Sequence, residues 1–281
     1  MTALSRQARH AGKRVGFVPT MGALHAGHLS LVRAARARCD VVVVSIFVNP
    51  TQFGPNEDFS KYPRTFDADC AMLEKEKADY VFHPSVEEMY PAGAATWVTV
   101  EGLSEKLDGG SRPGHFRGVT TIVSKLFNLV LPDMAFFGQK DAAQVAIISK
   151  MVRDLDFDLE IVVCPTVREA DGLAMSSRNA YLNPEQRKQA TVLYRTLMRL
   201  QMLVDRGETK SETLIAAGKQ VMAEESSVRL DYLEIVSPET LDPVMEIGRS
   251  ALIAVAAYVG TTRLIDNIVV HGTSAATKFS P

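Results

Sequence analysis

The first half of the chain alternates short runs of β-branched residues with amphipathic segments. Continuous apolar runs at residues 15–20 and 40–48 predict buried strands. Between them, residues 28–39 repeat apolar side chains at helical spacing, which predicts a helix with one apolar face. The same alternation recurs at 67–84 and twice more within 119–167. Repeated strand, helix and strand favour an α/β fold with a doubly wound parallel sheet covered by helices on both faces.

The pattern changes after about residue 170. A polar stretch there ends at Asn183-Pro184, a typical helix start, because proline suits the first helical position. Two helices are expected next. Three strands with short connections then follow, at 230–237, 251–259 and 263–270. This order predicts a smaller C-terminal α+β domain with an antiparallel sheet, so we expect two domains, residues 1–168 and 169–281.

Composition narrows the functional classes without naming one. The 281 residues carry 31 basic and 33 acidic side chains, and a formal net charge of −2 gives no support for a nucleic-acid surface. No apolar run approaches the roughly 20 residues that span a bilayer, and the basic N-terminus lacks the apolar core of a secretory signal. Three cysteines without metal spacing argue against a disulfide framework. We expect a cytoplasmic protein with no nucleic-acid or membrane partner.

The segment between the first predicted strand and helix, "MGALHAGH", carries the most specific candidate chemistry. Gly22 and Gly27 have the spacing that opens a phosphate-binding P-loop, but His28 and Leu29 stand where that motif needs Lys and Ser or Thr. Free backbone N–H groups and the helix dipole at such a turn suit a phosphate. If the helix begins near residue 26, the rings of His25 and His28 face one pocket. The pattern is typical of anion capture by a histidine pair.

Other interpretations of this turn stay open. A glycine-rich turn with two surface histidines would have the same sequence. A dinucleotide site is less favoured because no G-x-G-x-x-G occurs here. A zinc site would need a third ligand, and none is evident.

Further polar groups follow the other predicted strands. Gln52 is a neutral amide suited to hydroxyls and carboxylates, although an Asn-Pro turn with solvated polar residues explains this segment better when it is taken alone. In "FFGQKDAAQ", Lys140 supplies a charge for phosphate, and Asp141 could accept from a ribose hydroxyl or cap a helix. Two arginine-containing loops, at 111–119 and 174–179, could add basic groups or be solvated linkers. Together these segments put phosphate-suited groups at the carboxyl ends of successive strands.

Five segments together resemble the signature sequences of the pantoate–β-alanine ligase (pantothenate synthetase) family. They are "PTMGALHAGHLSL", "VNPTQFGPNEDFSKYPRT", "RPGHFRGV", "FFGQKD" and "PTVREADGLAMSSRNAYL", in order from about Val15 to Leu182. "HAGH" is similar to the HIGH-type element of the nucleotidyltransferase superfamily, and "MSSR" to its mobile KMSKS-type loop. The resemblance implies a Rossmann-like first domain and a C-terminal domain that acts as a lid.

The resemblance also implies a reaction. Pantoate would attack the α-phosphorus of ATP to give pantoyl adenylate and pyrophosphate, and the β-alanine amine would then displace AMP to give pantothenate. ATP would bring Mg²⁺, without a prosthetic group or a protein metal site, and the family is usually a homodimer.

Residue roles follow from the resemblance position by position. It implies catalytic roles for His28, His25, Lys140 and Arg178, with His28 as proton donor. Gln52 and Gln144 would bind pantoate, Gln52 would also face β-alanine, and Arg112 would lie near the site. The residues implied to bind ATP are Met21, Gly22, Ala23, Leu24, His25, Ala26, Gly27 and His28; Gly138, Gln139, Lys140 and Asp141; Val167; and Met175, Ser176, Ser177 and Arg178.

Two departures from the family pattern affect the pocket walls. Other members often have "GEKD" and "DFQQ" where this chain has "GQKD" and "DAAQ".

Three alternative functions stay open beside the ligase. A nucleotidyltransferase that moves AMP to another small acceptor would lack the pair of glutamines. A fragment of a class I aminoacyl-tRNA synthetase would need a basic RNA-binding surface, and a regulator on the same fold would bind ATP without turnover.

Overall fold

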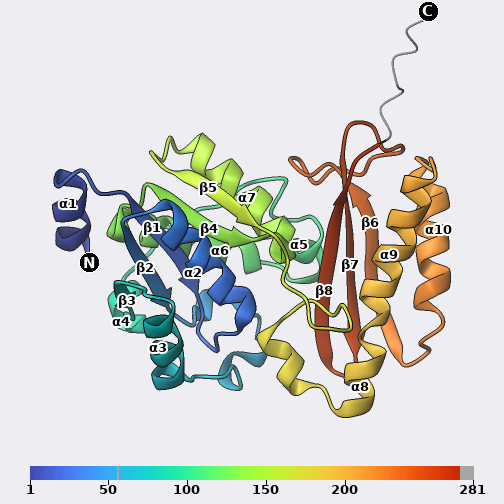
Figure 1. Cartoon of the computed structure of the whole chain (residues 1–281), viewed down its shortest axis with the longest axis horizontal. Coiled ribbons are helices and arrows are strands. Elements are labelled where there is room, and N and C mark those ends of the chain that lie inside the picture. Colours follow the sequence, from blue (N-terminus) through green and yellow to red (C-terminus); the bar gives the residue numbers. More distant parts are fainter. Residues whose placement is uncertain (56, 273–281) are drawn as a thin grey trace, which may run out of the picture. The chain divides into compact units, whose positions relative to one another are not determined.

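The parallel sheet expected for the first half of the chain is present in the computed structural model, which describes residues 1–55 and 57–272 (Figure 1). Five strands pair in the order β3-β2-β1-β4-β5, all of them parallel. Their bounds are β1 Val15–Thr20, β2 Val41–Ile46, β3 Tyr80–Phe82, β4 Met134–Gly138 and β5 Glu160–Cys164. The chain runs outward in opposite directions from β1 and β4, so the switch point, where ligands bind in such sheets, lies between these two strands.

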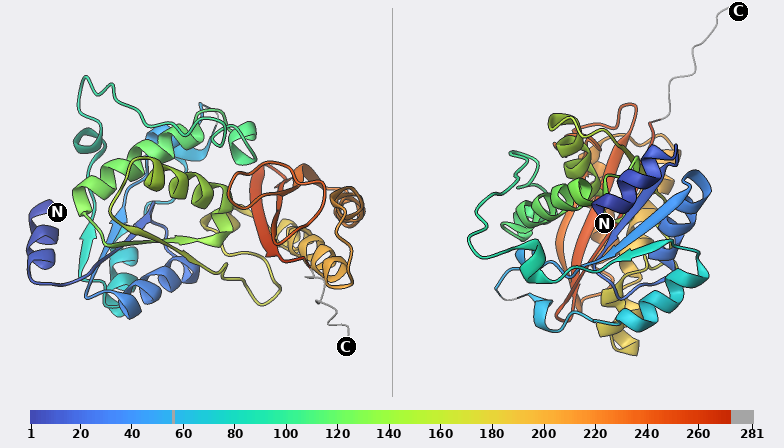
Figure 2. Two further views of the ribbon diagram at one scale, coloured as in Figure 1. Left: turned by 90° about the horizontal axis from the view of Figure 1, so that it is seen from above. Right: turned by 90° about the vertical axis from the view of Figure 1, so that its left-hand side faces the viewer.

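Helices cover both faces of this sheet. Figure 2 shows α2 and α3 on one face and α6 and α7 on the other. The helices of this part of the chain are α1 Thr2–His10, α2 Ala26–Arg38, α3 Phe66–Lys75, α4 Val86–Met89, α6 His115–Val130 and α7 Ala142–Asp154. The sheet is buried from both sides because its central strands are built from residues such as Phe17, Val43 and Phe136, which are fully buried. Helices α1 and α4 were not predicted from the sequence.

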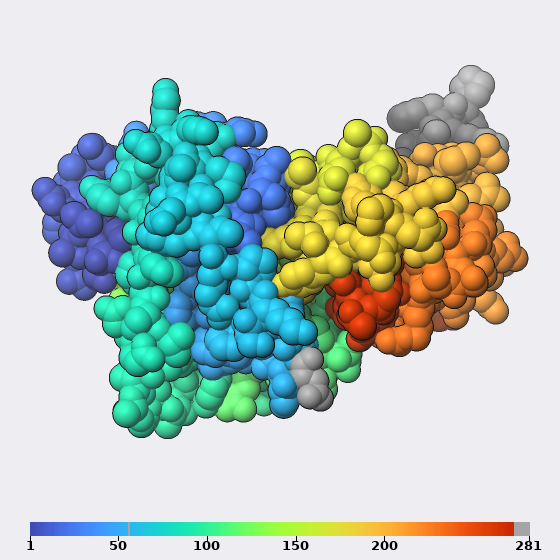
Figure 3. All heavy atoms as spheres, turned by 90° about the horizontal axis from the view of Figure 1, so that it is seen from below, coloured from blue at the N-terminus to red at the C-terminus, as the bar shows by residue number. Residues whose placement is uncertain are grey.

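A long segment between β2 and α6 covers one face of this part of the molecule. In the space-filling view of Figure 3, its cyan to teal atoms form most of the visible surface there. It contains the 3₁₀ turns Pro50–Gln52 and Asp58–Ser60 besides α3, β3 and α4. The segment leaves β2 at the carboxyl edge of the sheet, so its first residues lie beside the end of β1.

The chain divides into two compact units. The first comprises Met1–Glu105, Gly109–Val167 and Met175–Ser177, and the second comprises Lys106–Asp108, Arg168–Ala174 and Arg178–Pro281. A short helix, α5 (Asp108–Ser111), crosses one boundary of this division. Its first residue, Asp108, belongs to the second unit, and the rest of the helix belongs to the first.

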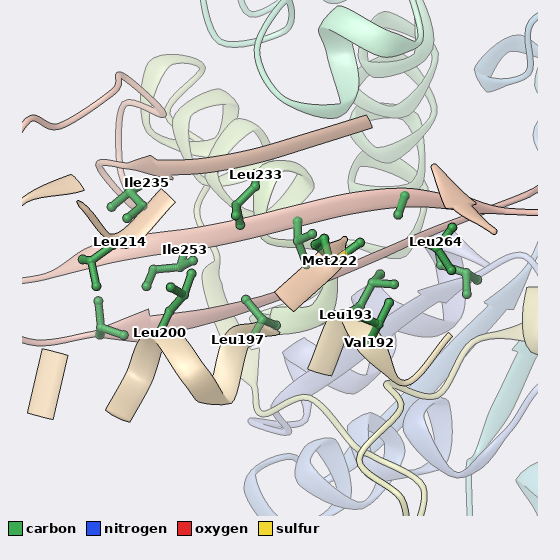
Figure 4. Close-up of a cluster of buried hydrophobic side chains, with 14 of the residues drawn as sticks. Val192, Leu193, Leu197, Leu200, Leu214, Met222, Leu233, Ile235, Ile253 and Leu264 are labelled. Atoms are coloured by element: carbon green, nitrogen blue, oxygen red, sulfur yellow. The ribbon is translucent and has the colours of Figure 1, made fainter. Parts of the chain in front are cut away.

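The second unit is built on an antiparallel sheet with the order β6-β7-β8. Its elements are α8 Pro184–Gln189, α9 Val192–Asp205, α10 Ser211–Met222, β6 Val228–Val236, β7 Ala251–Val259 and β8 Thr262–Val270. Leu197, Leu200 and Ile253 belong to the apolar cluster that fills the space between the helices and the sheet (Figure 4). Helix α10 lies so close to the sheet that a Cβ at Gly218 would be 2.5 Å from Leu233 Cδ2.

The fold class predicted from the sequence is therefore confirmed: a doubly wound α/β sheet with a smaller antiparallel α+β part. The start of α8 is also confirmed, because Asn183 caps it and Pro184 is its first residue. Within residues 1–55 and 57–272, no helix is both long and apolar enough to cross a membrane.

Candidate active site

The turn after β1 forms an unusual helix start built from two histidines. Helix α2 begins at Ala26, with His25 as its N-cap. The His25 ring accepts a hydrogen bond at Nδ1 from the Gly27 backbone N–H (3.1 Å), and the His28 ring accepts at Nδ1 from the His25 backbone N–H (3.4 Å). Because both Nδ1 atoms accept, a neutral ring at either position carries its proton on Nε2. The pair therefore presents Nε2–H donors while satisfying the first amides of the helix.

The two rings lie together, with centroids 4.1 Å apart. The pKa of His28 is lowered to about 3, chiefly by burial of the ring and next by the neighbouring His25. Lys140 also lowers this pKa, whereas Asp141 raises it. At neutral pH, His28 is therefore an uncharged hydrogen-bond donor rather than an imidazolium. The charges of Lys140 and Asp141 act on this ring, so the carboxyl ends of β1 and β4 contribute to one site.

Gln52, at the end of the turn after β2, is held beside the same loop. Its Nε2 donates to Met21 Sδ (2.9 Å), and its Oε1 accepts from Asn49 Nδ2 (3.0 Å). Asn49 is only 1% exposed and is itself fixed, because it donates to the Gly118 carbonyl (3.1 Å) and accepts from the Tyr90 hydroxyl (2.9 Å). The amide of Gln52 is thus oriented before any ligand binds.

Arg112 contacts Gln52 through the backbone. Its guanidinium donates to both carboxylate oxygens of Glu57, at 2.7 and 2.6 Å, and to the Gln52 carbonyl at 3.2 Å. It also lies 3.1 Å from His115 Nε2. An arginine can only donate, so Nε2 accepts and His115 Nδ1–H donates to the Gln52 carbonyl (2.8 Å). Nearby, Arg117 lies over the Trp97 ring, 4.3 Å from its centroid.

The end of β4 supplies the second group of candidate residues. Gly138 is followed by a 3₁₀ turn, Gln139–Asp141, and then by α7, whose first turn contains Gln144. A Cβ at Gly138 would meet no protein atom within 4 Å, so the space beside it is open. Asp141 is the N-cap of α7 but makes no capping hydrogen bond with its side chain. Lys140 Nζ lies 3.4 Å from Asp141 Oδ1.

The segment Met175–Ser177 lies on the histidine turn, within the first unit. Ser177 Oγ donates to the Ala23 carbonyl (3.0 Å), and the Met175 N–H donates to the Val167 carbonyl (3.0 Å). A Cβ at Gly27 would lie 3.8 Å from Met175 Cβ. Arg178, the next residue, is assigned to the second unit.

Two residues that bind parts of this site were not predicted from the sequence. Asp69 is fully buried and accepts hydrogen bonds from the Ala23 and Leu24 backbone N–H groups, and Glu57 holds Arg112. Both lie far along the chain from their partners, and no local pattern marks them. Over the part of the chain that the structure describes, no three His, Cys, Asp or Glu side chains are grouped as a metal site.

Comparison with known proteins identifies the family. The sequence model of pantoate-beta-alanine ligase matches residues 1–269. The pantothenate synthetase of Koribacter versatilis is 64% identical over 276 residues, which cover 98% of this chain and 95% of that protein. The crystal structure of the Thermus thermophilus enzyme superposes with a TM-score of 0.89 at 49% identity, covering 94% of this chain and 96% of that one.

A third relative was solved with ligands. The pantoate-beta-alanine ligase of Francisella tularensis, described as complexed with beta-gamma ATP and beta-alanine, superposes with a TM-score of 0.75 at 34% identity over 95% of each chain. These matches extend over nearly the whole chain and agree with the resemblance carried by the five sequence segments. The chain belongs to the pantoate–β-alanine ligase family.

Proposed function

We propose that this pantoate–β-alanine ligase binds the phosphates of ATP at the turn formed by residues 21–28 and makes pantoyl adenylate there. The main support is the reciprocal cap of His25 and His28, in which both rings accept at Nδ1 and carry the proton on Nε2 at the N-terminus of α2. Such a site offers the positive end of the helix dipole and neutral ring donors to an anion. The family's substrates include one anion of the right kind, the triphosphate of ATP.

In the first step, a carboxylate oxygen of pantoate attacks the α-phosphorus and the bond to pyrophosphate breaks. Negative charge builds on the α-phosphate oxygens and on the leaving group. His28 and His25 would donate to these oxygens, and Lys140 would add a fixed positive charge from the end of β4. Mg²⁺ would arrive with ATP as part of the substrate and neutralise the oxygens of the departing pyrophosphate. A neutral His28 would stabilise this charge as a donor, through its Nε2–H.

The two glutamines would bind the acid and the amine. Gln52 lies in the turn after β2 and Gln144 in the first turn of α7, after β4, and their amides match hydroxyl and carboxylate groups without fixing a charge. We propose that Arg112 acts on the substrates through Gln52, since its donors are taken up by Glu57 and by the Gln52 carbonyl. The Francisella tularensis relative with bound beta-alanine supports an amine subsite in this family.

The second step needs no nucleophile from the protein. The β-alanine nitrogen attacks the acyl carbon of the adenylate, the bond to AMP breaks, and the nitrogen loses a proton. Water would compete with the amine, so an element that closes the site is needed. We propose that residues 169–281 provide this lid and that Arg178 reaches the phosphates when it closes.

The remaining expected nucleotide contacts are also proposals. Gly138 and Asp141 would hold the ribose, the Val167 backbone the adenine, and Met175–Ser177 the phosphates. The open space beside Gly138 and the contact of Ser177 with Ala23 support these roles. From the family resemblance we further propose a homodimer that works in the cytoplasm. Sedimentation of the purified chain at micromolar concentration tests the dimer directly.

Product formation tests the proposed site. We expect purified wild-type protein with ATP, Mg²⁺, pantoate and β-alanine to release AMP and pantothenate in equal amounts. His28→Ala should lower kcat by roughly 100-fold to 1,000-fold, the usual cost of losing one oxyanion donor. His10→Ala, on the exposed surface of α1, is the matched control and should keep wild-type turnover. Wild-type turnover by correctly folded His28→Ala would contradict the assignment.

A further inference from the structure

We infer that Asp69 is a positioning residue for adenylate formation: its buried carboxylate sets the turn that aligns His25 and His28. Asp69 lies in the first turn of α3 and is fully buried. Its carboxylate binds the backbone of residues 23 and 24, so its effect on the histidine rings passes through that backbone. The inference rests on the proposed function, because it assumes that this histidine pair acts on ATP.

Both oxygens of the carboxylate are engaged. Oδ2 accepts from the Ala23 N–H (2.9 Å), and Oδ1 accepts from the Leu24 N–H (2.9 Å) and from the Thr65 hydroxyl (3.2 Å). Hydrogen bonds from backbone N–H groups to an ionised carboxylate are about twice as strong as neutral ones. The positive end of the α3 dipole also favours a negative charge in the first turn. This arrangement explains how a carboxylate is tolerated in a fully buried place.

The turn needs hydrogen bonds of this kind because its backbone is strained. Ala23 has a φ of 50°, in the left-handed region that residues with a Cβ adopt at a cost. Gly22, just before it, also has a positive φ, of 79°. The fit around the carboxylate is close, since a Cβ at Gly22 would lie 3.0 Å from Asp69 Oδ2. The two amides bound by Asp69 are those of the strained residue and its successor, so the carboxylate stabilises the strained conformation directly.

The histidine cap begins at the next residue. The His25 N–H, which follows the two amides held by Asp69, donates to His28 Nδ1, and this hydrogen bond determines which His28 nitrogen carries the proton. If the turn relaxes, the His25 N–H moves away from the ring, and His28 Nε2–H is no longer aimed at one place. Misplacement of a catalytic donor by about 1 Å can cost on the order of 100-fold in rate. Asp69 therefore acts on the orientation and tautomer of His28.

Asp69→Asn is the direct test in the full-length protein. Asparagine offers one acceptor oxygen where the aspartate offers two, and its NH₂ group would face a backbone N–H. We expect kcat for pantoate-dependent exchange of labelled pyrophosphate into ATP to fall by roughly 10-fold to 100-fold. The ¹⁵N resonances of His28, identified by their loss in His28→Gln, should lose the pattern of a single Nε2–H tautomer.

Asp133→Asn is the matched control. Asp133 Oδ2 accepts the Val15 N–H (2.7 Å) at the opposite end of β1, so the same kind of bond is weakened away from the site. This variant should lose stability but keep the wild-type kcat and His28 spectrum. If Asp69→Asn and Asp133→Asn behave alike, Asp69 has only a structural role and the inference is wrong.

Relief of the strain provides a second, independent readout. Glycine adopts a positive φ freely, so Ala23→Gly should make the turn depend less on Asp69. We expect Asp69→Asn combined with Ala23→Gly to recover part of the lost kcat, relative to Ala23→Gly alone. If Asp69→Asn does not fold, Thr65→Val, which removes one hydrogen bond to Oδ1, should lower kcat severalfold and shift the His28 resonances in the same direction. An unchanged kcat and spectrum in Thr65→Val would then overturn the inference.

Failure of the proposed function and failure of the inference about Asp69 give different results. A wild-type protein without pantoate-dependent exchange would contradict the proposed function itself. An active wild type whose Asp69→Asn variant matches it in kcat and in the His28 spectrum would contradict only the role of Asp69.

Discussion

Replacing His28 by glutamine should remove a pH-dependent part of the protein's stability. In the folded state the pKa of His28 is lowered to about 3, against an ordinary value of 6.5, chiefly by burial. Between these two values the unfolded chain binds a proton that the folded chain does not. The free energy of unfolding must therefore fall as the pH drops from 6.5 towards 3, and it is unaffected by this group above pH 7.

The magnitude follows from the size of the shift. At pH 4.5, two units below the unfolded pKa, the loss is about 1.4 kcal/mol per unit, or roughly 3 kcal/mol. Part of the residue faces solvent, so roughly 2–3 kcal/mol is the expected loss. Glutamine does not titrate but can still donate and accept hydrogen bonds. The difference in unfolding free energy between wild type and His28→Gln should therefore shift by this amount, in favour of the variant, between pH 7 and pH 4.5.

Urea unfolding followed by circular dichroism at the two pH values measures this difference. All other titrating groups are shared, so they cancel in the comparison to the extent that they do not interact with His28. His10→Gln, which changes an exposed histidine of α1, is the control for replacing a histidine away from the site. If the wild type and His28→Gln differ by the same amount at both pH values, the account of a neutral, desolvated His28 is refuted.

Three further substitutions test other parts of the structure. Asn49→Ala frees the amide of Gln52, so KM for pantoate should rise about tenfold with KM for ATP unchanged in steady-state assays; equal changes in both would contradict a role in orienting Gln52. Asp266→Asn leaves the guanidinium of Arg168 without its buried carboxylate and should cost about 2–4 kcal/mol in urea unfolding, whereas a loss below about 0.5 kcal/mol would show that the pair is dispensable. Gly218→Val crowds α10 against β6 and should lower stability by about 1–3 kcal/mol, and an unchanged Tm would mean that the helix moves away without cost.

The sequence predicted most of the fold because the signal for its strands is local. Strands β1 and β7 begin and end at the expected residues, since each is a continuous apolar run with a polar or glycine-containing boundary. Helix α1 was missed because most of its residues are polar and its only buried side chain is that of Ser5. Helix α2 begins at Ala26, two residues before the apolar periodicity at 28–39 and at the start that the histidine pocket required. Its cap is a histidine in place of the usual Ser, Thr, Asp or Asn.

The candidate site was predicted only as far as its residues lie at strand ends. The histidine turn, Gln52 and Lys140 lie in the loops that follow β1, β2 and β4, so the topology of a parallel sheet brings them to one edge. Asp69 and Glu57 act on residues 46 and 55 positions away, and nothing in their local sequence points to those partners. Long-range hydrogen bonds of this kind depend on how loops pack, which hydrophobic periodicity does not encode.

Exchange of labelled pyrophosphate into ATP is the most direct test of adenylate formation by this chain. The assay contains the purified protein, Mg²⁺ and ATP, with or without pantoate, and no β-alanine. We expect exchange only when pantoate is present, and we expect it to be nearly abolished in His28→Ala, because the first step is reversible and needs the histidine turn. Exchange without pantoate, or no exchange with pantoate in protein that binds ATP, would contradict the assignment of this site to pantoyl adenylate.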